Sequence, residues 1–217
     1  HDVAGCVVFG EYRIIEIELA NHFKVSRTVV RDVLSRLQER GLVRKNQSSH
    51  WIAGPLTAQT IKDHFALRRM LEPAALKSGA GSIDRDRIVG LYERMTALEV
   101  SQPVDHLEKL EEVQAHMIEY CVLGPTNERM RELIRNNLLP VTAAERLLRH
   151  LGLPDDSTAI TEMRLVVELL MRGAIEAAAA MLDTHLDASM KRMIAQMKIV
   201  SILPGPSVTA DYLTRVE

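Results

Sequence analysis

The residues best suited to a chemical role form one polar face of residues 27–37, near the N-terminus of the chain. Placed at 100° per residue, six side chains fill an arc of about 180° and all are polar. They are Arg27, Thr28, Arg31, Asp32, Ser35 and Arg36. Because guanidinium groups bind phosphate oxygens and the edges of guanine, this face is suited to contact with DNA. An ordinary surface helix with solvated arginines gives the same pattern, so spacing alone leaves both interpretations open.

The surrounding sequence predicts two short helices joined by a tight turn. Ser26 is a suitable N-cap for a helix that begins at Arg27, and residues 29, 30, 33, 34 and 37 give that helix an apolar face. A shorter helix is expected over residues 16–22. Two such helices form the helix-turn-helix pattern, in which the second helix enters the major groove. Residues 22–46 also hold seven Lys/Arg and only two Asp/Glu, in a chain of net charge −2.

Residues 19–43 resemble the DNA-binding domain of the GntR family of bacterial transcription regulators. Thirteen of these 25 positions match the family pattern in register: Leu19, Ala20, Val25, Ser26, Arg27, Thr28, Val30, Arg31, Leu34, Leu37, Gly41, Leu42 and Val43. The resemblance implies a winged helix, in which strands at residues 42–44 and 50–53 form the wing. Family members also have a helix before this region, which we expect to be shortened or missing here.

Seven residues are expected to meet DNA: Arg27, Thr28 and Arg31 at base edges, Ser26 and Arg36 at phosphates, and Lys24 and Arg44 as added charge. Three positions depart from the family pattern. Lys24 and Ser49 stand where glycine is common, and Val29 replaces a common proline. A residue other than glycine at a positive φ costs roughly 1 kcal/mol, which the packed domain is expected to absorb.

The sequence between Gly54-Pro55 and the tail predicts a series of helices. Apolar periodicity indicates helices over residues 57–78, 84–100, 104–122, 126–150, 158–172 and 174–197. Pro140 should kink or break the fourth of them. The expected fold is therefore mainly α, with three parts: a winged helix-turn-helix domain over residues 1–54, an all-helical effector-binding and dimerisation domain over 55–200, and a tail over 201–217.

The helical half resembles the FCD domain, the ligand-sensing half of the FadR-like branch of the same family. Arg68, Leu71 and Glu72 match its R-x-x-L-E motif, the stretch 112–116 matches D-x-x-F-H loosely, and the stretch 181–186 matches M-x-x-H-L with one residue of slack. Metal-binding members use one aspartate and three histidines. The resemblance implies that Glu112, His116 and His185 could hold Zn²⁺, Mn²⁺ or Ni²⁺. Met163 stands where the third histidine is expected, and a thioether is a poor ligand for these ions.

Three interpretations of these residues remain open. They form a three-ligand metal site completed by water or an effector carboxylate, a metal-free pocket, or a set of buried histidines that are hydrogen-bonded within the bundle. Arg68 either meets an effector carboxylate or pairs with Glu72 at i+4. The expected effector site comprises Arg68, His116, Met163 and His185, and its ligand is a small carboxylate or an acyl compound.

Composition limits the remaining classes of protein. The chain has 217 residues, of which 47% are hydrophobic and 26% charged, as in a globular protein. No apolar run approaches the roughly 20 residues of a membrane span, the start does not resemble a signal peptide, and Cys6 and Cys121 have no metal or redox spacing. These features predict a cytoplasmic protein. The resemblance to the GntR family implies a homodimeric transcription regulator, a repressor at a palindromic operator, with no enzymatic activity. The alternatives are an architectural DNA-binding protein without an effector and a metal-dependent enzyme.

Overall fold

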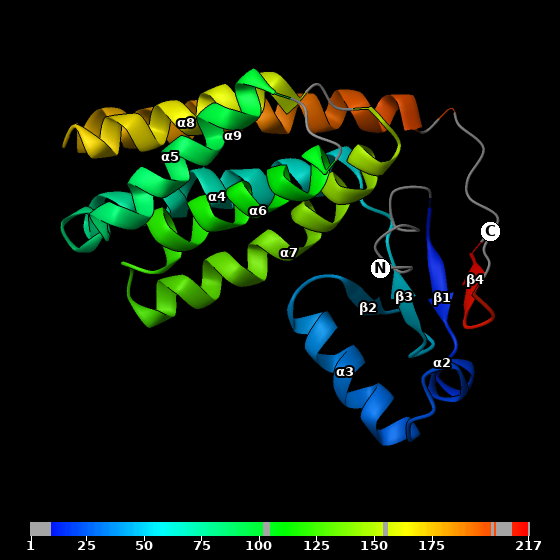
Figure 1. Ribbon diagram of the computed structural model, residues 1–217. Helices are drawn as coiled ribbons and strands as arrows, with labels where there is room; N and C mark the ends of the chain where they lie inside the picture. The colour runs from blue at the N-terminus through cyan, green and yellow to red at the C-terminus, as the bar shows by residue number, and fades with distance from the viewer. Residues whose placement is uncertain (1–9, 102–104, 154–155, 201, 203–209, 217) are drawn as a thin grey trace. The chain divides into compact units, whose positions relative to one another are not determined.

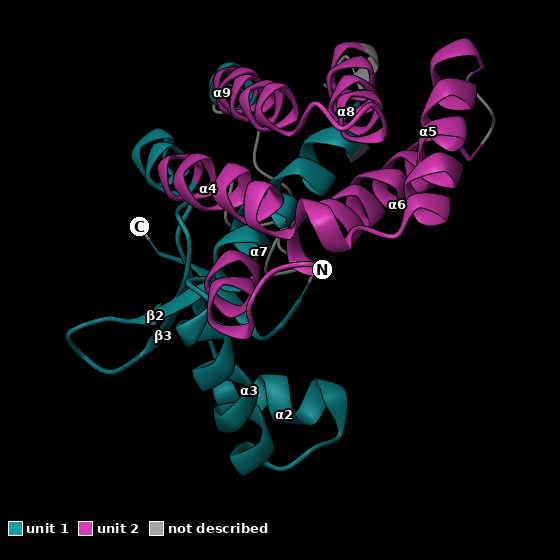
Figure 2. Ribbon diagram, turned by 90° about the vertical axis from the view of Figure 1, so that its left-hand side faces the viewer, with its two compact units in different colours: residues 1–64, 136–153, 193–217 teal, residues 65–135, 154–192 magenta. Residues whose placement is uncertain are grey.

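The computed structural model describes residues 10–101, 105–153, 156–200, 202 and 210–216. The expected shortening of the first helix and the free thiol of Cys6 lie outside these residues. The chain forms two compact units (Figure 2). Unit 1 comprises residues 1–64, 136–153 and 193–217 and has a net charge of +3, whereas unit 2 comprises residues 65–135 and 154–192 and has a net charge of −5. The expected boundary after residue 54 stays a prediction.

A four-stranded antiparallel sheet organises the N-terminal part of unit 1 (Figure 1). Its strands are β1 (Tyr12–Ile14), β2 (Val43–Lys45), β3 (Trp51–Ala53) and β4 (Leu213–Arg215), in the order β2-β3-β1-β4. The hairpin of β2 and β3 is the predicted wing. β4 lies in the segment that we expected to be a tail, and it pairs with β1 so that Tyr12 faces Arg215. The buried ring of Tyr212 anchors this strand against the ring of His22, at a centroid distance of 5.0 Å.

The predicted helix-turn-helix consists of α2 (Glu16–Phe23) and α3 (Arg27–Glu39). Ser26 caps α3 as expected, because its Oγ accepts a hydrogen bond of 3.3 Å from the backbone N–H of Val29. The turn passes through Lys24 at a φ of 53°, so this residue does occupy the left-handed conformation that glycine favours. The buried stripe of α3 is narrower than predicted. Val30 and Leu34 are buried, whereas Val29 and Val33 are 48% and 47% exposed.

The wing closes through a short turn between β2 and β3. Asn46 Oδ1 accepts hydrogen bonds from the backbone N–H groups of Ser48 and His50, at 3.1 and 2.9 Å. Ser49 has a φ of 60°. Like Lys24, it was predicted to stand at a position that favours glycine. The asparagine side chain therefore adds to the two backbone hydrogen bonds of this turn, from Asn46 N–H to His50 O and from Ser49 N–H to Asn46 O.

The rest of the chain is helical, as predicted. Its elements are α4 (Ala58–Gly79), the 3-10 turn η1 (Ala80–Ser82), α5 (Arg85–Val100), α6 (His106–Ile118), the π-helical turn η2 (Glu119–Leu123), α7 (Glu128–His150), α8 (Asp156–Met171) and α9 (Ile175–Val200). Pro140 does not break α7, which continues through it. None of the helices in the described ranges is long and apolar enough to cross a membrane.

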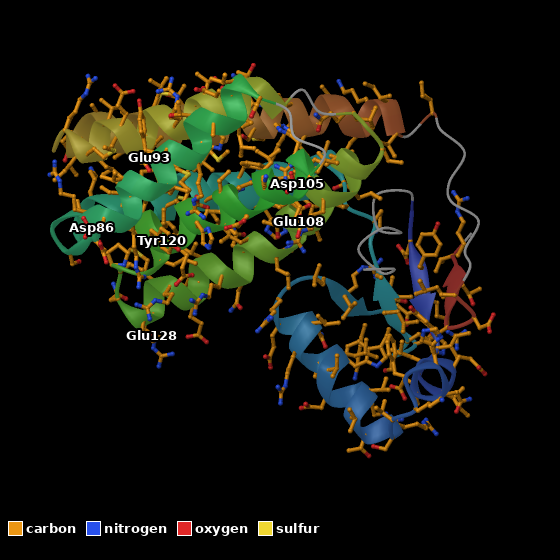
Figure 3. All side chains as sticks on the ribbon, viewed as in Figure 1. Asp86, Glu93, Asp105, Glu108, Tyr120 and Glu128 are labelled. Atoms are coloured by element: carbon orange, nitrogen blue, oxygen red, sulfur yellow. The ribbon has the colours of Figure 1, made fainter. Side chains whose placement is uncertain are left out.

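The core of unit 2 is built where α5 packs against α6 and α8. Leu91, Met95 and Leu110 are fully buried, as is the thiol of Cys121, which is free as expected. Burial raises the pKa of Cys121 to about 12, so the thiol is protonated and unreactive at neutral pH. Exposed carboxylates cover the outside of the unit, among them those labelled in Figure 3: Asp86, Glu93, Asp105, Glu108 and Glu128.

Candidate nucleic-acid interface and effector site

The first turn of α3 presents two arginines that are held by one carboxylate. Arg31 Nε donates a hydrogen bond of 2.9 Å to Oε2 of Glu16, and Arg27 Nη2 lies 3.5 Å from the same oxygen. Both arginine side chains remain more than half exposed, at 58% for Arg27 and 59% for Arg31. Glu16 begins α2, so this contact joins the two helices of the motif on their exposed side.

The second oxygen of Glu16 is engaged by the wing. Trp51, in β3, donates from its indole Nε1 to Oε1 of Glu16 at 2.9 Å. Burial by itself would raise the pKa of Glu16, but the hydrogen bonds from Trp51 and Arg31 and the charge of Arg31 outweigh it and hold the pKa below the ordinary value of 4.5. Glu16 is therefore ionised at neutral pH. Sequence reasoning missed it, because its partners lie 11, 15 and 35 residues away.

The remaining residues predicted to meet DNA are exposed, and two of them are paired within the protein. Arg36 forms an ion pair of 3.0 Å with Asp32, one turn earlier on α3. Arg44 in β2 forms one of 2.6 Å with Glu11. Such exposed pairs are worth little in water, so either arginine can exchange its partner for a phosphate. Lys24 and Thr28 are also exposed.

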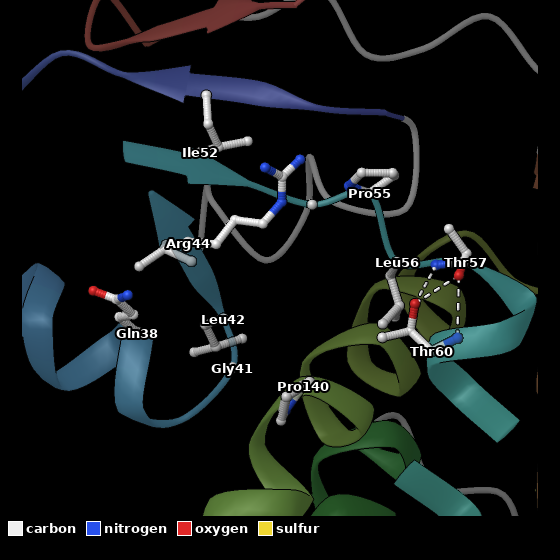
Figure 4. Close-up of a pocket in the computed structure, with 12 residues that line it drawn as sticks. Gln38, Gly41, Leu42, Arg44, Ile52, Pro55, Leu56, Thr57, Thr60 and Pro140 are labelled. Atoms are coloured by element: carbon white, nitrogen blue, oxygen red, sulfur yellow. Dashed lines mark hydrogen bonds between the residues drawn. The ribbon is translucent and has the colours of Figure 1, made fainter. Parts of the chain in front are cut away.

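A cavity of about 520 Å³ lies within unit 1, beside the end of α3 (Figure 4). Its walls come from the end of α3, the wing, the start of α4 and Pro140 of α7, and most of its lining is apolar. The hydroxyl groups of Thr57 and Thr60 line it but are bonded to each other and to each other's backbone N–H, which caps α4. Arg44, the charged residue in its lining, is already paired with Glu11.

Comparison with known proteins agrees with this geometry. Residues 13–51 match the profile of bacterial regulatory proteins of the gntR family. The winged helix of the described residues is thus similar in sequence to that of the gntR family. Among curated proteins, the Nta operon transcriptional regulator of Aminobacter aminovorans is 40% identical to this chain over 65 residues. That match covers 30% of this chain and 31% of the relative, so it concerns about a third of each protein.

Several solved structures share the fold over most of the chain. E. coli McbR/YncC is 18% identical, with a TM-score of 0.67 and coverage of 92% of this chain and 93% of its own. A GntR regulator from Rhodococcus sp. RHA1 is 21% identical, with a TM-score of 0.62 and 93% coverage of both chains. The metal-free FCD domain of a third regulator is 19% identical, with a TM-score of 0.56, and the match covers 67% of this chain and 99% of that domain. The second and third of these are described as transcriptional regulators.

Two of the predicted metal ligands, Glu112 and His116, lie together on α6. Arg94 of α5 contacts both of them. Arg94 Nη1 donates to Glu112 Oε1 at 2.9 Å and to His116 Nδ1 at 3.2 Å. His116 also stacks on Tyr120, with a centroid distance of 5.0 Å and an interplanar angle of 12°. A guanidinium therefore engages one carboxylate oxygen of Glu112 and one ring nitrogen of His116.

The third predicted ligand, His185, belongs to a different cluster. Its Nδ1 donates to Oε2 of Glu162 at 2.7 Å, and Arg192 donates to both oxygens of the same carboxylate, at 3.0 and 2.8 Å. Burial would raise the pKa of Glu162, but hydrogen bonds from His185 and Arg192, together with their charges, hold it at about 2. Sequence reasoning missed Glu162, although it lies one position before Met163, where a ligand was sought.

The residues present do not fit the metal site that the resemblance implied. In the described part of the chain, no group of three or more His, Cys, Asp or Glu side chains could hold a metal ion. The set of Glu112, His116 and His185 is therefore not assembled as expected, because Glu112 and His116 lie with Arg94, whereas His185 lies with Glu162 and Arg192. Met163, in the place of the third histidine, is 1% exposed and packs in the core.

The predicted effector residue Arg68 is buried and paired. Its Nε donates to Oε1 of Glu72 at 2.6 Å, and the two residues are only 4% and 1% exposed. The i, i+4 pair that we considered from the sequence is present, but in the interior and not on the surface. The neighbouring Arg69 takes the surface role, because it binds Asp183 and Asp187, each at 2.7 Å.

A second cavity opens between α5 and α6, next to the Arg94 cluster. Its volume is about 280 Å³, and it is lined by Arg94, Ala97, Leu98, Ser101, Lys109, Glu112 and Val113. Two cationic side chains outnumber the single carboxylate of Glu112, which pairs with Arg94, and together with a hydroxyl and an apolar floor they suit a small organic anion. Of the four predicted effector residues, only His116 adjoins this cavity, through its hydrogen bond from Arg94.

Proposed function

We propose that this protein is a transcriptional regulator that binds double-stranded DNA as a homodimer. The proposal rests above all on the exposed first turn of α3, which carries Arg27, Thr28 and Arg31 on a GntR-family winged helix. In helix-turn-helix proteins, this end of the second helix lies nearest the base edges. The net charge of +3 on unit 1, against −5 on unit 2, supports the proposal because it concentrates attraction for phosphates on the unit that carries α3.

We assign the seven residues predicted to meet DNA to two roles, recognition of bases and positioning of the protein on phosphates. An arginine at the start of α3 can bind guanine through two hydrogen bonds, worth about 1–3 kcal/mol of discrimination, and we assign this role to Arg27 and Arg31. Thr28, between them, is assigned to a base edge. The remaining four are assigned to the phosphates, which fix the register of the protein without reading sequence: Ser26, Lys24, Arg36 and Arg44.

The small surface by which one winged helix contacts DNA supports a homodimer. One winged helix covers a few base pairs, which is too few for tight and selective binding. Two copies of α3 about 34–36 Å apart would meet two half-sites one helical turn apart, so the operator should be palindromic. We propose that occupation of this operator represses transcription, which a reporter fused to the operator tests directly. Higher expression in cells that lack the protein is the expected result.

We further propose that the effector is a small carboxylate and that it binds in the cavity between α5 and α6. Arg94 and Lys109 would pair with its carboxylate, because both line the cavity and both are about half exposed. The volume of about 280 Å³ favours a short ligand over a long acyl chain. To regulate, the ligand must bind the DNA-competent and incompetent arrangements of the dimer with different affinity.

The DNA assignment is tested with an operator that the protein itself selects from random duplexes. Arg27→Ala and Arg31→Ala should each weaken binding by about 5- to 100-fold, corresponding to the loss of one bidentate base contact. Arg129→Ala is the matched control, since Arg129 is 91% exposed and lies in unit 2. Unchanged affinity of both α3 variants, or failure of the parent to select any sequence, would overturn the assignment.

The architectural alternative is favoured by one observation. Met117 and Met163 are 2% and 1% exposed, so they fill space inside the helical bundle where other FCD-like proteins could hold a ligand. A thermal-shift screen of small carboxylates separates the two functions. Stabilisation that is lost in Arg94→Leu and kept in Arg135→Leu supports the effector site, because Arg135 pairs with Glu119 away from the cavity. No stabilisation by any carboxylate would favour an architectural role.

A further inference from the structure

Glu16 has no place in the contacts assigned above, yet both arginines assigned to base reading converge on it. Arg31 and Arg27 approach Oε2 at 2.9 and 3.5 Å, while Trp51 occupies Oε1 at 2.9 Å. Only 20% of the Glu16 side chain is exposed, whereas each arginine is more than half exposed. The carboxylate is thus fixed from the wing side and offers its free lone pairs to the recognition helix.

A carboxylate in this position competes with DNA phosphates. Carboxylates and phosphates bind the same guanidinium donors with the same geometry, so Arg31 Nε cannot serve Glu16 and a phosphate at once. Binding to DNA of any sequence is almost wholly electrostatic and grows with each guanidinium that is free to neutralise a phosphate. Glu16 therefore lowers the attraction of α3 for the phosphate backbone, which every sequence shares.

We propose that Glu16 is a positioning residue that withholds Arg27 and Arg31 from DNA phosphates and keeps them directed to base edges. Selectivity for the operator over other DNA then depends on this carboxylate, although it does not read a base itself. The role of Trp51 is to prevent Glu16 from rotating away with the arginines when DNA approaches. The inference rests on the proposed DNA-binding function. It adds what sets the specificity ratio, which is the affinity for the operator divided by the affinity for other DNA.

Glu16→Gln is the informative substitution. Glutamine keeps an oxygen that can accept from Trp51 and nearly the same shape, so the change removes the charge and little else. Glu18→Gln is the matched control. It makes the same change of charge two residues along α2, and no ion pair of Glu18 is found among the described residues. A general effect of net charge would appear equally in both variants.

The experiment compares the selected operator with a scrambled duplex of the same length, by fluorescence anisotropy over a range of NaCl concentrations. We expect Glu16→Gln to bind the scrambled duplex about 3- to 10-fold more tightly and to steepen its salt dependence by about one to two phosphate contacts. Operator affinity should rise less, so the specificity ratio falls. Glu18→Gln should leave the ratio within about twofold of the parent.

A ratio unchanged in Glu16→Gln, or changed equally in Glu18→Gln, would overturn the inference. A parent protein without preference for any duplex would instead overturn the proposed function, so the two failures are distinguishable. If circular dichroism shows that Glu16→Gln does not fold, Glu16→Asp takes its place. Aspartate keeps the charge but is one methylene shorter, so it should lower the ratio by a smaller factor, and an unchanged ratio would again count against the role.

Discussion

His185 Nδ1 donates a hydrogen bond of 2.7 Å to Oε2 of Glu162, which joins α9 to α8. Arg192 binds both oxygens of the same carboxylate from the next turns of α9. The histidine that the FCD resemblance assigned to a metal ion is therefore part of an internal ion-pair network. At α6, Arg94 likewise donates hydrogen bonds to Glu112 and His116. In both clusters an arginine supplies the positive charge that the resemblance assigned to a metal ion.

Glu162→Gln should reduce stability in a way that depends on pH. The pKa of Glu162 is about 2 in the folded protein and has an ordinary value of 4.5, so the stabilisation is present above about pH 4.5 and is lost as the pH falls towards 2. Urea unfolding at pH 7 should show a loss of about 1–3 kcal/mol. The difference from the parent should shrink between pH 4.5 and 3. In the control Glu132→Gln, at an exposed pair, stability should change by less than about 0.5 kcal/mol at every pH. A loss that is independent of pH would contradict the assignment.

The purified protein should hold far less than one equivalent of Zn²⁺, Mn²⁺ or Ni²⁺ after dialysis against the metal. The reason is that no group of three or more His, Cys, Asp or Glu side chains in the described residues could hold a metal ion, and Glu112 already pairs with Arg94. Mass spectrometry of the dialysed protein measures the content, and a chelator should leave the melting temperature unchanged. One full equivalent that disappears in both His116→Ala and His185→Ala would show that the two histidines meet in solution.

Arg36→Ala and Arg44→Ala should weaken binding to the operator and to scrambled DNA by the same factor. Both arginines are exposed and are assigned to phosphates, which carry no sequence information. Each substitution should also reduce the slope of log K against log salt by about 0.9, the value for one phosphate contact. Arg129→Ala, in unit 2, should alter neither quantity. A selective loss for the operator would mean that the arginine reads a base.

Tyr212→Ala should reduce the free energy of unfolding by about 3 kcal/mol, the lower end of the usual range for removal of a buried aromatic ring. Tyr212 is 2% exposed, packs against His22 and precedes the strand that pairs with β1. Thr214→Ala is the control within the same strand, because Thr214 is exposed and should cost less than about 0.5 kcal/mol. Thermal unfolding followed by circular dichroism distinguishes them. Equal stability of both variants would mean that β4 contributes little to the sheet in solution.

Local signals in the sequence determined the elements that carry the DNA interface. The cap at Ser26 and the turn at Lys24 were predicted, because each depends on residues within about four positions, whereas the strands of the wing were implied by the family resemblance. Helical periodicity likewise located the six long helices, since the period of 3.6 is read within one segment. The family resemblance added the expectation that the polar face of α3 meets DNA, which periodicity alone left open.

Tertiary structure decided which charged groups meet. Glu16 and Trp51 are 35 residues apart, Arg94 and His116 are 22 apart, and β4 pairs with a strand near the other end of the chain. No periodicity or motif encodes such contacts, because they depend on how whole elements pack and on which partner lies within hydrogen-bonding distance afterwards. The sequence thus determined that α3 is basic and exposed. Packing determined that Arg27 and Arg31 share the carboxylate of Glu16 and that the predicted metal ligands are bound to other side chains.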